Sequence, residues 1–221
     1  MDKVIKVWVK YYPVFLKGLW GTMWLAMVTL LAGTILGLIV AFLRMSKFKP
    51  ASAVAAVYIQ ILRGTPILLQ LYFFWILLPK VMPFNMSDLA CIVVALIINA
   101  SAYIAEIVRA GIAAVDPGQW EAGRSIGLTE IHLMQKIIMP QAVKNILPAL
   151  GNEFIMIVKD TSLASTFFIG DLMTQCLLIK GTTYLTMEPL IMVAVVYFAV
   201  TFILTKLLGV FERRLRRGDI R

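Results

Sequence analysis

Charged residues are scarce in this chain of 221 residues: they make up 15% of it, whereas hydrophobic residues make up 61%. A soluble domain of this length would carry about 25% charged residues. Residues 19–43 contain no charged side chain at all, and this run is longer than the roughly 20 residues that a helix needs to cross a bilayer. The composition therefore excludes a soluble enzyme and predicts an integral membrane protein.

Residues suited to metal or redox chemistry are also few. His132 is the only histidine in the sequence, so a histidine metal cluster is excluded. Cys91 and Cys176 lack metal-ligand spacing. They fall near the non-cytoplasmic ends of apolar segments, where they are either buried hydrophobes or disulfide partners. We expect no metal and no cofactor on this chain. A membrane-embedded enzyme would need a nucleophile with a partner base or a metal cluster, and the sequence shows neither at helical spacing.

Five apolar segments are long enough to span a membrane with modest tilt. They are residues 19–43, 53–79, 89–110, 145–170 and 184–208. The sequence therefore predicts an all-α membrane protein, a bundle of five transmembrane helices in one domain, residues 19–208. Gly33 and Gly37 have the GxxxG spacing of a helix-packing face, although a chance match explains the spacing almost as well.

Basic residues predict the orientation, because short loops rich in Lys and Arg stay in the cytoplasm. One alternate set of segment flanks carries twelve of them and the opposite set carries six. The first set includes the loop 113–144 and the tail 209–221, so both are expected in the cytoplasm. With an odd number of spans, the amino terminus then lies outside. The opposite set comprises Lys3, Lys6, Lys10, Lys17, Lys80 and Lys180.

The four amino-terminal lysines run against this orientation. We expect residues 1–18 to form an interfacial segment on the outer membrane surface, with Trp8, Tyr11, Tyr12 and Trp20 at headgroup depth. An even number of spans, with both termini inside, is the alternative. The basic tail 209–221 is expected to contact lipid headgroups, and no nucleic-acid binding is expected.

The loop 113–144 is a polar island between two apolar segments. Asp116 and Pro117 predict the start of a short helix, and Gly127 predicts its end. Thr129 is the expected cap of a second helix, which Pro140 interrupts.

The two loop helices are expected to have different faces. Glu121, Ala122 and Gly123 would offer a small-residue face to a partner. The second helix has apolar residues at helical intervals, and this face would pack beneath the bundle. These apolar residues are Ile131, Met134, Ile137 and Ile138. On composition alone, an amphipathic connector resting on the membrane explains the loop equally well.

The spacing within the loop resembles the "EAA" signature of permease subunits in ATP-binding-cassette (ABC) importers. The matching residues are Glu121, Ala122, Gly123, Gly127, Ile137, Met139 and Pro140. Gly123 replaces the usual alanine and Met139 the usual leucine, and both keep the size or apolarity of the position. The stretches 63–79, 102–112 and 147–165 resemble the polar amino acid uptake branch of that superfamily, so the likeness covers roughly residues 15 to 215.

The resemblance implies a type I importer fold with a cytoplasmic coupling helix, in the inner membrane of a bacterium. It implies a dimeric pathway completed by a second copy or a paralogue, two ATPase subunits on the coupling loops, and an extracytoplasmic binding protein. No G-x-x-x-x-G-K-[ST] phosphate loop is present, so ATP and Mg²⁺ would bind the partner ATPase. An ion-coupled transporter or channel is the rival class.

Ionisable residues inside spans are costly and usually mark a pathway. Glu153 and Asp160 are the candidates for a substrate ammonium group or a cationic side chain. Arg63, or N–H groups near Thr65 and Pro66, would hold the substrate carboxylate. Asn99 and Ser162 are further candidate contacts. Structural pairing is the alternative for Arg63, Glu106, Glu153 and Asp160. The substrate is expected to be a polar amino acid. The two acidic residues Glu153 and Asp160 weakly favour a basic one.

Overall fold

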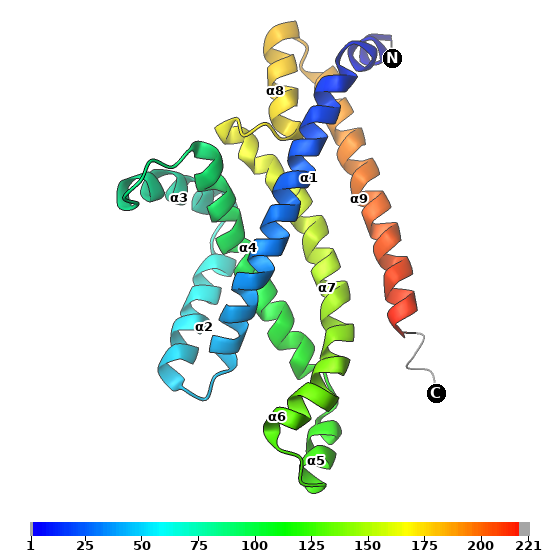
Figure 1. Ribbon diagram of the computed structural model, residues 1–221. Helices are drawn as coiled ribbons and strands as arrows, with labels where there is room; N and C mark the ends of the chain where they lie inside the picture. The colour runs from blue at the N-terminus through cyan, green and yellow to red at the C-terminus, as the bar shows by residue number, and fades with distance from the viewer. Residues whose placement is uncertain (1, 217–221) are drawn as a thin grey trace.

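The computed structural model describes residues 2–216, and every regular element in that part of the chain is a helix. The all-α prediction is confirmed. The elements in chain order are α1 (Asp2–Met45), α2 (Lys49–Gly64), α3 (Ile67–Val81), α4 (Asp88–Ala113), α5 (Pro117–Ser125), α6 (Glu130–Leu133), the π-helical turn η1 (Met134–Ile138), α7 (Met139–Asp160), the 3₁₀ helix η2 (Thr161–Phe167), α8 (Leu172–Thr183) and α9 (Met187–Arg216). The molecule is elongated, with α5 and α6 at one end and the amino terminus and α8 at the other (Figure 1).

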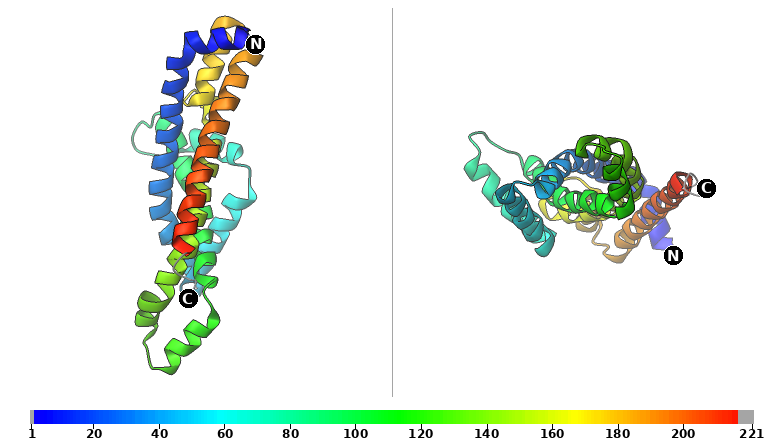
Figure 2. Two further views of the ribbon diagram at one scale, coloured as in Figure 1. Left: turned by 90° about the vertical axis from the view of Figure 1, so that its right-hand side faces the viewer. Right: turned by 90° about the horizontal axis from the view of Figure 1, so that it is seen from below.

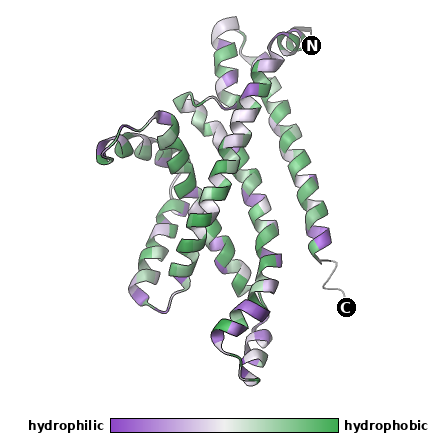
Figure 3. Cartoon of the chain, viewed as in Figure 1, coloured by the Kyte–Doolittle hydropathy of each residue, from purple (hydrophilic) through white to green (hydrophobic). Residues whose placement is uncertain are grey.

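Three stretches of helix are individually long and apolar enough to cross a membrane: Val4–Met45, Asp88–Ala113 and Met187–Leu215. Two bent pairs qualify when each is taken together, α2 with α3 and Glu130–Phe167 with α8. The predicted five spans are therefore confirmed when each bent pair counts as one span. Hydrophobic residues run along the middle of the long helices, and hydrophilic residues gather at the α5–α6 end (Figure 3).

Helix α1 packs along α4, and two glycines allow the close approach. A Cβ atom on Gly33 would lie 3.2 Å from the Cβ of Ala100, and one on Gly37 would lie 2.8 Å from Cγ2 of Ile104. A larger side chain at Gly37 would force the helices apart. The GxxxG pair is therefore a packing face within the chain.

The second predicted span is broken at Thr65 and Pro66, where the chain bends by 113° between α2 and α3. Proline has no N–H to donate to the preceding turn, which ends the helix there. The expected break at Pro66 is confirmed, but residues 53–79 are two helices and not one kinked helix.

The first span begins earlier than residue 19, because α1 is continuous from Asp2 to Met45 and has Pro13 inside it. No break separates residues 2–18 from the span, although the amino-terminal turns bend over the end of the molecule (Figure 2). Of the predicted tail 209–221, residues up to 216 extend α9, and 217–221 lie outside the described residues.

A tight polar junction joins the middle of α1 to the start of α8. The backbone N–H of Leu172 donates to the hydroxyl of Thr22 at 3.0 Å. The fully buried Asp171 caps α8 by accepting from the backbone N–H groups of Met173 and Thr174, and the Thr174 hydroxyl also donates to it. These bonds fix the turn before α8 against α1.

Candidate functional site

The first loop helix, α5, has the ends that its sequence predicts. Asp116 caps it by accepting a hydrogen bond from the N–H of Gly118 at 2.7 Å. Gly127 adopts a φ of 79° just after the helix, a conformation that glycine takes without strain. The N–H of Leu128 then donates to the carbonyl of Gly123 at 3.1 Å, which closes the helix end in the manner of a Schellman motif.

The second loop helix begins at the predicted cap, where the Thr129 hydroxyl accepts from the N–H of His132. The expectation that Pro140 interrupts this helix is wrong. Pro140 lies in the first turn of α7, directly after the π-helical turn Met134–Ile138. A wider turn absorbs the backbone bond that proline does not make, so the helix runs from Glu130 to Phe167 without a break.

Gly123 faces the interior of the loop and not a partner. It is buried, and a Cβ atom there would overlap the side chain of Leu133, which is itself fully buried. The predicted small-residue face therefore loses Gly123, which instead lets α5 pack closely on α6. Ile137 also packs inward against the core. Glu121, Ala122, Gly127 and Pro140 are exposed.

An ion pair that the sequence analysis missed ties the two arms of the loop together. Arg124 donates from Nε to the Glu130 carboxylate at 2.8 Å, and these bonds raise the pKa of the guanidinium above its ordinary value. Arg124 also lies over the ring of Trp120, 5.7 Å from its centroid. The two residues are six positions apart and lie on different helices, so the spacing of three or four residues that predicts an ion pair within a helix is absent.

Two isoleucines stand exposed on this polar loop. Ile126 is 75% exposed and Ile131 is 69% exposed. Ile131 was expected to pack beneath the bundle, and the structure shows that it does not, because the buried face of this helix passes through Leu133 and Ile138. Both side chains are therefore available to a partner protein or to lipid.

The break in the second span is held by Gln70, which the sequence analysis also missed. Its Nε2 donates to the Leu62 carbonyl at 2.8 Å and to the Thr65 hydroxyl at 2.8 Å. Its Oε1 accepts from Nδ2 of Asn99 on α4 at 2.8 Å. Gln70 and Asn99 are both buried. Thr65 and Asn99, two of the predicted substrate contacts, are therefore engaged within the protein.

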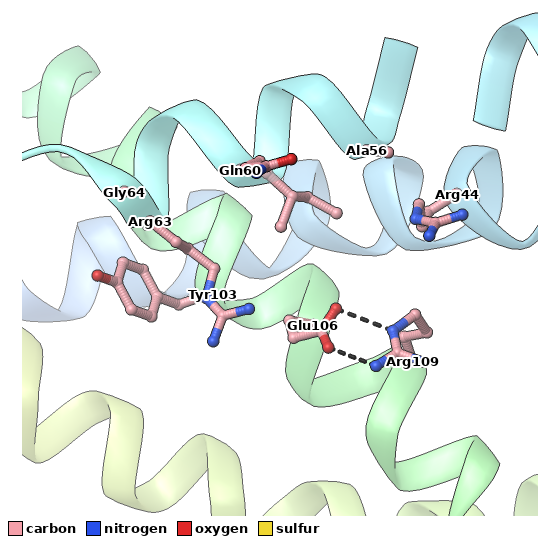
Figure 4. A pocket seen from close by; sticks show the side chains of 9 residues that line it. Arg44, Ala56, Gln60, Arg63, Gly64, Tyr103, Glu106 and Arg109 are labelled. Carbon is pink, nitrogen blue, oxygen red and sulfur yellow. Dashed lines mark hydrogen bonds and ion pairs between the residues drawn. The ribbon is translucent and has the colours of Figure 1, made fainter. Parts of the chain in front are cut away.

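Arg63 lines a cavity of about 620 Å³ between α2, α4 and the end of α1 (Figure 4). The other polar residues lining it are Arg44, Gln60, Tyr103, Glu106 and Arg109. Glu106 pairs with Arg109 through Oε1 to Nη2 at 2.5 Å and Oε2 to Nε at 2.9 Å, which supports structural pairing for Glu106. Arg63 lies 5.4 Å from the Tyr103 ring centroid and has no ion pair among residues 4–215, whose side chains the structure describes.

Glu153 and Asp160 are half-buried on α7. Neither carboxylate has a hydrogen-bond partner within the described part of the chain, and Glu153 lies within electrostatic range of both Arg63 and Asp160. Ser162 instead lines a separate cavity of about 370 Å³ between η2, α8 and α9. Neither acid lines the cavity of Arg63, and Ser162, Thr65 and Asn99 also lie outside it.

The described residues contain no group of three or more histidine, cysteine, aspartate or glutamate side chains arranged to hold a metal. Both cysteines are free and buried, so Cys91 and Cys176 are not joined in a disulfide. Of the two interpretations of these cysteines, the structure agrees with buried apolar residues and not with a disulfide.

Comparisons with known proteins match nearly the whole chain. The sequence profile of a family described as "Binding-protein-dependent transport system inner membrane component" matches residues 33–217. The chain is 36% identical over 207 residues to the arginine transport system permease protein ArtQ of Bacillus subtilis (strain 168), covering 94% of each chain. It is 35% identical over 207 residues to the glutamine transport system permease protein GlnP of Escherichia coli (strain K12), covering 92% of this chain and 94% of the relative.

A solved structure extends the comparison to three dimensions. The crystal structure of an amino acid ABC transporter with histidines contains a chain that superposes with a TM-score of 0.89 at 46% sequence identity. The match covers 93% of this chain and 96% of that chain. The likeness therefore extends to the arrangement of the helices.

Proposed function

Since the chain belongs to the family of binding-protein-dependent transport system inner membrane components, we propose that its loop 113–144 couples it to a separate ATPase. The chain is a permease subunit of an amino acid ABC importer. Two exposed isoleucines, Ile126 and Ile131, carry the proposal for the loop. They stand on a surface stiffened by a helix cap and an ion pair, which suits a permanent protein contact.

The helix that leaves the loop suits the transmission of motion. It is continuous from Glu130 to Phe167, so a displacement of the loop would be carried to Glu153 and Asp160 as a rigid-body movement. On this proposal, ATP binding draws two coupling loops together and opens the cavity outward, and hydrolysis resets it. ATP and Mg²⁺ are held by the ATPase subunits.

The full assembly would contain two permease chains, each forming half of the translocation pathway. The second is another copy of this chain or a paralogue. An extracytoplasmic binding protein would deliver the substrate. The loop 113–144 and the carboxyl end would lie in the cytoplasm and the amino terminus outside, with the chain in the inner membrane.

The coupling proposal is tested with Ala122→Arg. Ala122 is exposed on α5, so an arginine there leaves the fold intact but places an unpaired charge in the ATPase contact. Because a buried unpaired charge costs several kcal/mol, we expect ATPase co-purification and ATP-dependent uptake to fall about tenfold or more. Asn85→Arg introduces the same side chain at an exposed site between α3 and α4, outside the apolar segments, and should leave both measurements unchanged. Equal ATPase recovery from both variants would show that the loop is not the docking site.

The energy source separates an ATP-driven importer from an ion-coupled transporter. Uptake into vesicles should require ATP on the cytoplasmic side and should survive an uncoupler that collapses the proton gradient. Uptake that persists without ATP and stops with the uncoupler would favour the ion-coupled class.

We further propose that the substrate is a basic amino acid whose cationic groups lie between Glu153 and Asp160, with Arg63 holding the carboxylate. Glu153 and Asp160 are half-buried, and their carboxylates have no hydrogen-bond partner among the side chains of residues 4–215, an arrangement that favours a cationic ligand.

The substrate proposal is tested with Glu153→Gln and Asp160→Asn, each nearly isosteric. Because a hydrogen bond to a charged group contributes about 1.5–3 kcal/mol, each change should raise the KM for labelled arginine about tenfold or more. Glu188→Gln, outside both cavities, is the matched control. Unchanged arginine uptake in both test variants would remove these residues from the substrate site.

A further inference from the structure

Import and coupling leave the amino-terminal lysines unexplained. Lys6 and Lys10 line a cavity of about 320 Å³ between the start of α1 and the far end of α8. The cavity lies at the end of the molecule opposite α5 and α6 (Figure 1). The other lining residues are Val7, Tyr11, Thr183 and Leu185.

The cavity combines an apolar floor with a cationic rim. Val7 is buried, and Tyr11 and Leu185 pack in the same hydrophobic cluster. The Lys6 and Lys10 side chains are exposed. Neither ammonium group has an ion-pair partner among the residues whose side chains the structure describes. Such a site fits a ligand with an anionic head and an apolar body.

Exposed aromatic residues lie next to the lining residues in the chain and further along α1. Trp8 is 38% exposed and Trp20 is 73% exposed on α1. Tyr184, which follows α8 with a φ of 58°, is 91% exposed. Tryptophan and tyrosine side chains prefer the membrane–water interface, where one part of the ring is apolar and the other is hydrated. The cavity therefore faces headgroups and not the aqueous surface alone.

We propose that this cavity binds the headgroup of an anionic phospholipid, with Lys6 and Lys10 on the phosphate and with Val7, Tyr11 and Leu185 against the glycerol and acyl chains. Its assignment to the outer leaflet rests on the proposed orientation. Lysines at the outer end oppose the usual charge bias of membrane proteins, and an anionic lipid bound there would offset that cost. An acidic protein surface fits less well, because the lining below the two ammonium groups is apolar.

The test uses the full-length chain purified with its ATPase from vesicles of phosphatidylglycerol and phosphatidylcholine in equal amounts. Lipids retained after mild extraction are counted by native mass spectrometry. We expect retained phosphatidylglycerol to exceed phosphatidylcholine. Each lost lysine should lower the retention of phosphatidylglycerol about fivefold, because one basic residue near an anionic membrane surface strengthens binding by a factor of about that size. The test variant is K6Q/K10Q.

The control is K17Q/K80Q, which removes two positive charges that are expected on the same side of the membrane but lie outside the cavity. It should change phosphatidylglycerol retention less than twofold. Equal losses in both variants, or no loss in K6Q/K10Q, would overturn the proposal. Displacement of the lipid by millimolar glycerol phosphate would instead indicate a site for free phosphate esters. Weaker affinity for the binding protein with unchanged lipid retention would indicate a protein-docking surface.

Two further measurements separate this proposal from the proposed function. An unchanged unfolding temperature and unchanged ATPase co-purification in K6Q/K10Q would show that folding and coupling are intact. A preference for phosphatidylglycerol confined to the cytoplasmic leaflet, in vesicles of asymmetric composition, would contradict the outer-leaflet assignment without affecting the coupling result.

Discussion

Gln70 holds together the two sides of the break in the second span. Its amide donates to Leu62 and Thr65 and accepts from Asn99. The network lies in the interior, where an unmet hydrogen-bonding group costs more than in water. A single buried amide thereby replaces the hydrogen bond to the Leu62 carbonyl that Pro66 cannot donate.

Gln70→Leu and Asn99→Leu are each expected to lower the free energy of unfolding by about 1–3 kcal/mol, because each leaves a buried polar partner unsatisfied. The double variant should cost less than the sum, since the two single changes break a shared bond. Thermal unfolding in detergent measures all three. Gln60→Leu, at an exposed site on α2, is the control and should have little effect. Strictly additive losses would contradict the network.

At the scale of elements, the turn that leads into α8 approaches α1 through its backbone as well as through side chains. A Cβ atom on Gly21 would lie 2.5 Å from the carbonyl oxygen of Gly170. Gly170 has a φ of 88°, and the adjoining Asp171 is fully buried, so this turn has little freedom to move. The position of α8 on α1 therefore depends on the missing side chain at Gly21.

Gly21→Ala is expected to destabilise the protein by about 1–3 kcal/mol, the usual cost of forcing extra volume into a packed site. Gly181→Ala is the matched control, because Gly181 lies inside α8 with no atom within 4 Å of an added Cβ. That change should stabilise the helix by up to about 1 kcal/mol. The unfolding temperatures should thus shift in opposite directions, and a loss of the same size in both would show that the contact with Gly170 is unimportant.

At the scale of the whole molecule, the amino terminus and the loop 113–144 lie at opposite ends (Figure 2). If the loop is cytoplasmic, the start of α1 must be outside, because the spans between them leave no other arrangement. Helix α9 remains largely uncovered, with 6% of its apolar window buried within the chain. That face is available to lipid or to the second permease chain.

The orientation predicts which introduced cysteines react in intact cells. Cys91 and Cys176 are both buried, so an exposed new cysteine is the reactive one. Ile5→Cys on α1 should be labelled by a membrane-impermeant thiol reagent without permeabilisation, whereas Ser46→Cys between α1 and α2 should be labelled only after it. The reverse pattern would invert the proposed topology and move the lipid site to the inner leaflet.

The sequence by itself determined the features that depend on neighbours along the chain. Apolar run lengths indicated five spans, and Asp116, Gly127 and Thr129 marked helix ends, because a cap or a positive φ is satisfied within a few residues. Pro66 marked the break for the same reason. The resemblance in the loop 113–144 indicated the family, because its residues recur at fixed spacing.

Only the tertiary structure decided which residues meet. Gln70 and Asn99 lie 29 positions apart, and no local pattern indicates that pairing. Gly123 turned inward because Leu133 fills the space beside it, and Ser162 fell in a different cavity from Arg63 because η2 carries it toward α9. Such contacts depend on how whole helices pack against one another. Packing depends on the helix surfaces, and residues far apart in the sequence share a surface contact only in the folded protein.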